Sequence, residues 1–258
     1  MIRARILLGL CAVLAAVVVA PSAASADPFE GPPICSSAGT ALSGSYGNLT
    51  VTGNAYVAKG TTLNVWGNLT LAKGSCLDAF TLGTVKVGGS VLVGDGATLG
   101  LGCSPGAIGP KPPCGTSRTS DTVGGNIIAN QPLTMYLTAT SIRGSVVSIG
   151  GGPGPVFSPY INYPIKENVI GGNLLVAGWK GAWFGVLRNS IGGNAVLLNN
   201  VGVTISEETH LPDSSEIVSN SISGNLVCFG NQPAAQLGDS EGAPNNVGGH
   251  KYGQCTAL

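Results

Sequence analysis

Short apolar runs alternate with glycine-rich turns along most of this chain. One phrase recurs, in which a Gly is followed by an Asn or Ser and then by a run with apolar residues at alternate positions. Since successive side chains of a strand point to opposite faces, each run predicts a short strand with one apolar face. In the first copy Leu49 and Val51 lie on that face and Thr50 lies on the other. The copies span residues 47–51, 67–71, 89–93, 125–129, 144–148, 172–176, 193–197 and 224–228, and a degenerate ninth copy begins at Gly249.

The spacing of these copies indicates a solenoid. The steps between successive glycines are 20, 22, 36, 19, 28, 21 and 31 residues, and four of the seven fall between 19 and 22. One coil cannot bury its apolar row alone, whereas stacked coils bury it continuously and pair their strands in parallel. The longer steps then read as one coil plus an inserted loop. A β-sandwich with glycine-rich turns is the alternative, but sandwich strands are not copies of one another.

We therefore expect an all-β, single-domain parallel β-helix of about eight or nine coils, with two or three strands in each. It should occupy residues 45–258, after an N-terminal segment at 27–44. The expected insertions lie near 102–118, 150–166 and 204–219, and a C-terminal cap is expected over 229–258. The open ends of a solenoid expose strand edges, so self-association through those ends is expected if the cap, held by Cys255, is lost.

The recurring turn has a simple physical basis. Gly adopts backbone conformations that other residues resist, and Asn tolerates left-handed geometry better than most residues. When coils stack, these asparagines should form a ladder in which each side-chain amide bonds to the next. The asparagines are therefore interpreted as structural groups and not as ligands.

Composition excludes several classes of protein. Of the 258 residues 41 are glycine, and 9% are charged against about 25% in an ordinary soluble domain. Basic and acidic residues balance at 12 each, which leaves no basic surplus for nucleic acid. The apolar content is too high for a disordered chain, and the glycines lack the three-residue period of collagen.

The first 26 residues have the pattern of a signal peptide. Arg3 and Arg5 precede an apolar run over residues 6–20, and Ala24-Ser25-Ala26 forms a small-x-small cleavage site. The mature chain should begin at Asp27, be secreted or cell-wall associated, and have no membrane segment. Removal of the two arginines leaves 10 basic against 12 acidic residues, so the mature chain is slightly acidic.

An exported chain with an even number of cysteines favours disulfides. The sequence has seven cysteines, and removal of the signal peptide with Cys11 leaves six: Cys35, Cys76, Cys103, Cys114, Cys228 and Cys255. We favour Cys103–Cys114, which closes a short proline-rich loop, and Cys228–Cys255, which ties down the C-terminal tail; Cys35–Cys76 follows by elimination. A thiolate metal site is disfavoured, since no CxxC pair and no neighbouring histidine occurs. We expect neither a metal nor a cofactor.

The best candidate for ligand binding is an aromatic segment. Six of the fourteen aromatic residues lie between residues 157 and 184. Exposed tyrosine and tryptophan rings stack on sugars, so an extracellular or cell-wall glycan is the expected partner. The alternative is that an inserted loop folds these rings onto the solenoid and shields its backbone. The candidate ligand-binding residues are Tyr160, Tyr163, Trp179, Trp183 and Phe184.

No catalytic motif occurs in the chain, and we assign no catalytic residue. An acidic insertion contains Glu207, Glu208, His210, Asp213 and Glu216. It could hold a metal or an acid–base pair, but a solvated loop is the favoured interpretation. Arg118, which lies near Asp121, and Arg143 are the only candidates for the base of a lyase.

The phrase Gly-Asn-Leu-x-Val at about 20-residue spacing resembles exported bacterial parallel β-helix proteins, and it is similar to the polymer-forming solenoid domains of bactofilins. Bactofilins differ in being shorter, cytosolic and free of cysteine. The resemblance covers residues 45 to about 250 and carries no catalytic motif. It implies a scaffold or surface role, and analogy with most parallel β-helices implies a right-handed coil. We expect a secreted structural or binding protein; the alternative is a polysaccharide-degrading lyase or glycoside hydrolase on the same fold.

Overall fold

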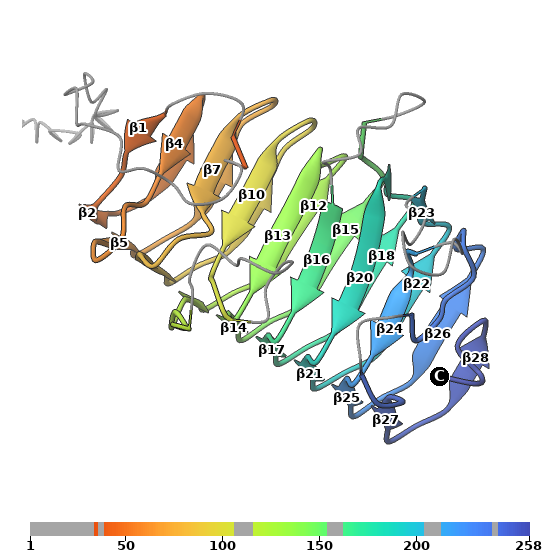
Figure 1. Ribbon diagram of the computed structural model, residues 1–258. Helices are drawn as coiled ribbons and strands as arrows, with labels where there is room; N and C mark the ends of the chain where they lie inside the picture. The colour runs from red at the N-terminus through yellow and green to blue at the C-terminus, as the bar shows by residue number, and fades with distance from the viewer. Residues whose placement is uncertain (1–33, 36–38, 106–115, 154–161, 204–212, 239–241) are drawn as a thin grey trace, which may run out of the picture.

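The protein is a parallel β-helix, as the repeat predicts (Figure 1). The computed structural model describes residues 34–35, 39–105, 116–153, 162–203, 213–238 and 242–258. These residues form strands and turns without a helix, so none of them belongs to a helix that could span a membrane. The predicted signal peptide lies outside the described residues.

Three sheets run the length of the solenoid, and every strand pair in them is parallel. The first coil shows the order: β2 (Gly44–Tyr46) belongs to sheet B, β3 (Leu49–Val51) to sheet C and β4 (Asn54–Tyr56) to sheet A. Sheets B and C contain nine strands each, which gives nine coils. Because each strand pairs with its copy in the next coil, the sandwich alternative is wrong. In Figure 1 sheet A faces the viewer, sheet C lies behind it and sheet B runs along the lower edge.

Sheet A consists of β1 (Thr40–Ala41), β4, β7 (Cys76–Ala79), β10 (Thr98–Leu101), β13 (Thr134–Thr138), β16 (Asn162–Lys166), β20 (Trp183–Leu187) and β24 (Glu216–Val218). Sheet B consists of β2, β5 (Thr62–Val65), β8 (Thr84–Val87), β11 (Thr122–Val123), β14 (Ser141–Ile142), β17 (Val169–Ile170), β21 (Ser190–Ile191), β25 (Ser221–Ile222) and β27 (Asn246–Val247). Sheet C consists of β3, β6 (Leu69–Leu71), β9 (Val91–Val93), β12 (Ile127–Asn130), β15 (Val146–Ile149), β18 (Leu174–Ala177), β22 (Ala195–Leu198), β26 (Leu226–Phe229) and β28 (Lys251–Gly253). A small fourth sheet pairs β19 (Lys180–Gly181) with β23 (Val201–Gly202).

The core is the continuous apolar stack that the alternation predicts. In sheet C one inward position holds an apolar residue in eight successive coils, and its side chain is fully buried from the second coil to the eighth. The column reads Leu49, Leu69, Val91, Ile127, Val146, Leu174, Ala195 and Leu226. Full burial of one such aliphatic side chain contributes roughly 1.5–3 kcal/mol, and stacking multiplies this along the solenoid.

The Gly-Asn turn works differently from the predicted ladder of amide pairs. The main bond runs from a backbone N–H to the side chain of the preceding coil: the Asn68 N–H donates to Asn48 Oδ1 at 2.8 Å. Serine serves equally as the acceptor, and the Asn126 N–H donates to Ser90 Oγ at 3.0 Å. The glycine makes room for this acceptor, since a Cβ at Gly67 would lie only 2.1 Å from Asn48 Oδ1.

Two further amide ladders lie buried at the other corners, and the sequence analysis did not predict them. The ladder before sheet B contains Asn168, Asn189, Asn220 and Asn245. The ladder after sheet C contains Asn200, Asn231 and Gln254. In both, the amide oxygen accepts from the backbone N–H of the coil before, so the corner bonds that hold the coils together are satisfied inside the solenoid. The repeated Asn-Ser-Ile at 189–191 and 220–222 was the signal for the first of them.

Two of the segments expected as insertions end in regular strands. Residues 162–166 form β16 and residues 216–218 form β24, both within sheet A. The expected cap is also shorter than predicted, because β27 and β28 complete a ninth coil. The phrase at Gly249 is therefore a true repeat, and the His250 N–H donates to Asn225 Oδ1 at 2.9 Å.

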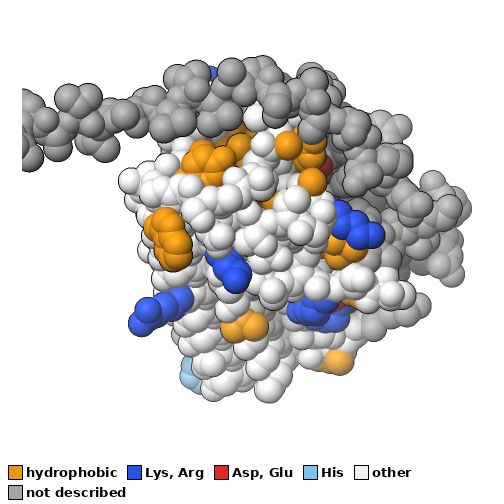
Figure 2. All heavy atoms as spheres, turned by 90° about the vertical axis from the view of Figure 1, so that its left-hand side faces the viewer, with side chains coloured by type: hydrophobic (Ala, Val, Ile, Leu, Met, Phe, Trp, Pro, Cys, Tyr) orange, Lys and Arg blue, Asp and Glu red, His pale blue; other side chains and the backbone are white. Residues whose placement is uncertain are grey.

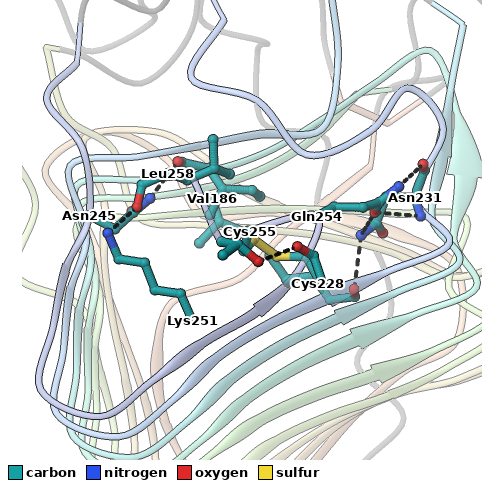
Figure 3. Close-up of a disulfide and its surroundings, with 12 residues drawn as sticks. Val186, Cys228, Asn231, Asn245, Lys251, Gln254, Cys255 and Leu258 are labelled. Carbon is teal, nitrogen blue, oxygen red and sulfur yellow. Dashed lines mark hydrogen bonds between the residues drawn. A yellow bond between two sulfur atoms is a disulfide. The ribbon is translucent and has the colours of Figure 1, made fainter.

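Disulfides fasten both ends of the solenoid. Cys35 is bonded to Cys76, and Cys228 is bonded to Cys255, which are two of the three pairings that the sequence favours. Figure 3 shows the second bond, beside which Gln254 pairs with Asn231 and Lys251 donates to the Leu258 carbonyl. Cys255 and Leu258 are buried over the last coil, so the tail closes that end of the core. Cys103 is also disulfide-bonded, whereas Cys114 lies outside the described residues.

Candidate functional site

The predicted aromatic ligand-binding face is not at the surface. Tyr163, Trp179 and Phe184 are among the largest fully buried side chains of the described chain. They cannot offer a ring to a sugar, so the prediction is wrong for these three residues. Trp183 is half-buried, and Tyr160 lies outside the described residues.

These rings fill the solenoid interior in its middle coils. The Tyr163 ring lies 5.0 Å from the Trp179 ring and 6.1 Å from the Phe184 ring, measured between centroids. The Trp179 indole N–H donates to the Leu133 carbonyl at 3.1 Å, which satisfies its polar atom inside the core. The extra strands β19 and β23 lengthen the perimeter of the coils around this cluster, and so make room for larger side chains. Tyr163 belongs to β16 and not to an inserted loop, while Trp179 and Phe184 turn inward from the next coil.

The acidic insertion does not form a described site either. Glu207, Glu208 and His210 lie outside the described residues, and Glu216 is buried in β24. Within the parts of the chain that the structure describes, no three His, Cys, Asp or Glu side chains come together to hold a metal. Arg118 is engaged elsewhere: its guanidinium forms an ion pair with Glu167 at 2.7 Å and donates to the Glu167 carbonyl.

The outer face of sheet A carries one cluster of ionisable groups. The Lys166 Nζ lies 4.8 Å from the ring centroid of Trp183 on the neighbouring strand. Burial lowers the pKa of Lys166 to about 8, and the positive charge of Arg188 adds to this effect. The carboxylates of Glu216 and Glu167 act in the opposite direction. Glu167 itself is held between Arg118 and Arg188, so the cluster ties the segment before β11 to the corner after β16.

The outer face of sheet C is the most unusual surface of the described chain. Its outward positions are apolar in seven successive coils, and a second outward column beside it is apolar in four. The first column contains Leu92, Ile128, Val147, Leu175, Val196, Val227 and Tyr252. The second contains Ile149, Ala177, Leu198 and Phe229. We call these eleven residues the apolar face.

Solvent reaches this face. Ile128, Ile149, Phe229 and Tyr252 are each 42–51% exposed, and they make up four of the seven exposed large hydrophobic residues in the described chain. The remaining seven residues are half-buried, because neighbours in a stacked column shade one another. The largest contiguous apolar patch of a monomeric soluble protein often marks an interaction surface.

Sheet B is an internal reference for this surface. Its outward column is polar in eight of nine coils and reads Ser45, Asn64, Lys86, Thr122, Ser141, Val169, Ser190, Ser221 and Asn246. Polar outward positions are the rule for a sheet with one face in water. The fold therefore does not require apolar residues outside, and the composition of sheet C is a property of that face alone.

The sequence contained a signal for the apolar face. The second residue after each Asn or Ser of the repeat is Thr in the first two copies and Leu, Ile or Val in the next six. From the third copy onward the runs are thus apolar on both faces of the strand. Only the buried half of this pattern is needed to predict the solenoid core.

Charged groups are sparse elsewhere on the surface. On the side shown in Figure 2, which is the left-hand side of Figure 1, lysine and arginine side chains are scattered singly and acidic side chains are scarcely visible. Among the residues that the structure describes, this arrangement offers no concentrated electrostatic site on that side. Comparison of the chain with family models, with curated proteins and with solved structures found no match.

Proposed function

We propose that this chain is an exported, non-enzymatic structural protein that acts as a rigid rod with one adhesive side. The apolar face carries this proposal, since it is continuous over seven coils and contains no charged residue. Such a face gains free energy when it is covered, because apolar area leaves water. The disulfides are typical of an oxidising compartment, which favours the secreted or cell-wall location expected from residues 1–26.

The construction of the rod supports a mechanical role. Amide ladders and parallel strand pairs hold each coil to its neighbours, and a disulfide fastens each end. An extracellular glycan remains the proposed contact at the cell wall. Among the described residues of the predicted aromatic site, only Trp183 is exposed enough to reach a glycan.

The proposal is tested by expressing the full chain in a bacterial host and locating the processed protein. We expect a mature N-terminus at Asp27, recovery in the medium or cell-wall fraction, and no change in chain length of any polysaccharide incubated with it. Production of new reducing ends or unsaturated sugars would contradict a structural role.

A polysaccharide-degrading enzyme is the second candidate, and the Lys166 cluster favours it. A lysine whose pKa is lowered to about 8 is partly neutral near that pH and can accept a proton. The Glu216 side chain is outward on sheet A but fully buried, and its charge acts on Lys166 from beneath the surface. If turnover is found, Lys166→Met should abolish it and the rate should rise through pH 8. Turnover that survives Lys166→Met would remove this cluster from consideration.

A further inference from the structure

We propose that the occupant of the apolar face is a second copy of this chain, packed sheet C against sheet C. The inference rests on the proposed structural role, and it names the partner that the role requires. It concerns the side of the rod, and so differs from an association through the open ends of the solenoid.

The regular geometry of the face favours a copy of itself. Parallel register places one outward side chain per coil, with neighbouring strands about 4.8 Å apart. A second sheet C has the same spacing. The outward side chains of one copy can therefore fit between the outward side chains of the other along the whole column. Two sheets pack in this way about 10 Å apart with their strands nearly aligned. The same patch then serves on both partners, as in a two-fold symmetric dimer.

Charge also favours a copy. The apolar face holds no Asp, Glu, Lys or Arg, and the expected mature chain is close to neutral, with 10 basic and 12 acidic residues. Two copies therefore meet without repulsion, and a partner recognised through its charge would find no counter-charge on this face. Exposed asparagines such as Asn173 border the face at its Gly-Asn corner and can supply the polar rim that protein interfaces usually have.

The area of the face sets the expected strength. Seven coils at about 4.8 Å and two columns of side chains give a patch of roughly 30 by 12 Å, or about 400 Å² in projection on each copy. Stable interfaces bury about 800 Å² on each partner, and weaker encounters bury less. We therefore expect a reversible dimer with a dissociation constant in the micromolar range.

The first two coils offer a matched control. Thr50 and Thr70 occupy the same outward column as Leu175, but they precede the apolar residues. The lysines of Thr70→Lys and Leu175→Lys would both point outward from sheet C. Only the second would place a charge in the middle of the proposed contact.

The experiment is sedimentation equilibrium of the mature chain between about 1 and 200 μM, with Leu175→Lys and Thr70→Lys measured in parallel. Circular dichroism establishes that each variant keeps the fold. We expect a monomer–dimer equilibrium in the native chain, an unchanged equilibrium in Thr70→Lys, and a dissociation constant raised at least about tenfold in Leu175→Lys. Val196→Lys should repeat the loss and guards against misfolding of a single variant.

A monomer throughout the concentration range would overturn the proposal. A dimer that persists equally in Leu175→Lys and Val196→Lys would also overturn it, because the contact would then lie elsewhere. A monomer that adsorbs to insoluble glycan and is released by Leu175→Lys would replace the second copy with a glycan partner. That last result leaves the structural role intact, whereas polysaccharide turnover would contradict the role itself.

Discussion

Sheets B and C are built by the same stacking and yet present opposite surfaces. Each contributes one strand to every coil, and each turns an apolar side toward the core. Outside, sheet B presents mainly Ser, Thr and Asn, whereas sheet C presents mainly Val, Leu and Ile. Since backbone geometry is shared, the difference cannot be a requirement of the fold. It is the reason why we propose sheet C as the side on which the rod meets a partner.

The two sheets also begin at different kinds of corner. The ladder that precedes sheet B is buried, and the ladder that precedes sheet C is largely exposed to water. Buried hydrogen bonds are costly to lose because the stranded partners cannot turn to solvent. The corner before sheet B should therefore fix the coil more strongly than the corner before sheet C.

The largest effect is expected from a pair of adjacent substitutions in β18. Leu174 points into the core and Leu175 points outward from sheet C. Leu174→Asp should destabilise the protein by about 5 kcal/mol or more, since a carboxylate would enter the apolar stack without a partner. Leu175→Asp should leave the melting temperature almost unchanged. Thermal unfolding followed by circular dichroism measures both, and equal losses would mean that the apolar face is part of the core.

The corner ladders should differ by a smaller amount. Asn189 donates to the Ile165 carbonyl at 2.8 Å and its Oδ1 accepts from Asn168, all within the buried corner. Asn189→Ala should cost about 3 kcal/mol because several buried groups lose their partners at once. Asn194→Ala removes the acceptor for the Asn225 N–H at the outer corner and should cost about 1 kcal/mol. Chemical denaturation compares the two, and a larger loss for Asn194→Ala would contradict the argument.

Asp121 occupies the column of the buried ladder before sheet B, two coils ahead of Asn168, and should make stability depend on pH. Its Oδ1 accepts from the Val85 N–H at 2.8 Å, as the asparagines do in later coils. Burial raises the pKa of Asp121 from 3.8 to about 7, so folding favours the protonated acid. Protonation of Asp121 therefore contributes to the free energy of unfolding. The contribution is complete below pH 3.8, where the acid is protonated in both states, and it is lost as the pH rises through the folded pKa of about 7.

Asp121→Asn should therefore raise the free energy of unfolding at pH 8 by on the order of 2 kcal/mol and have little effect at pH 4. The measurement is chemical denaturation at the two pH values. An equal change at both would show that the charge of Asp121 is not the cause.

The smallest change in stability is expected when sheet B is converted toward sheet C. Val169 already interrupts the polar outward column, and Ser190 and Ser221 follow it in the next coils. The double substitution Ser190→Val and Ser221→Val should alter the free energy of unfolding by no more than about 0.5 kcal/mol, because both sites are exposed. It should create a second adhesive strip and produce species larger than a dimer in sedimentation. An unchanged association state would mean that apolar outward residues in three successive coils, at positions 169, 190 and 221, are too few to bind a second chain.

Most of the fold could be predicted because the repeat encodes it twice, in the Gly-Asn turns and in the alternation of strands such as 69–71. The aromatic cluster could not be located in this way. Tyr163 lies within the long step from Gly144 to Gly172, and length alone does not say where an insertion ends and the next strand begins. Asn200 and Asn231 were missed for another reason: their neighbours vary, and only the stacking of coils brings their amides together.

The direction of the corner bonds has a consequence for how the rod is assembled. At the outer corner each new coil donates to a side chain of the coil already formed, as Asn194 does to Asn173. At the buried corners the earlier coil donates to the later one, as Asn189 does to Asn220. When the chain emerges N-terminus first, each new coil can donate at once to the outer-corner side chain of the coil before it. The backbone N–H groups at the buried corners are satisfied only after the following coil has folded. In the ninth coil Gln254 accepts from the Asn231 N–H of the eighth, and the disulfide between Cys228 and Cys255 ties these two coils together.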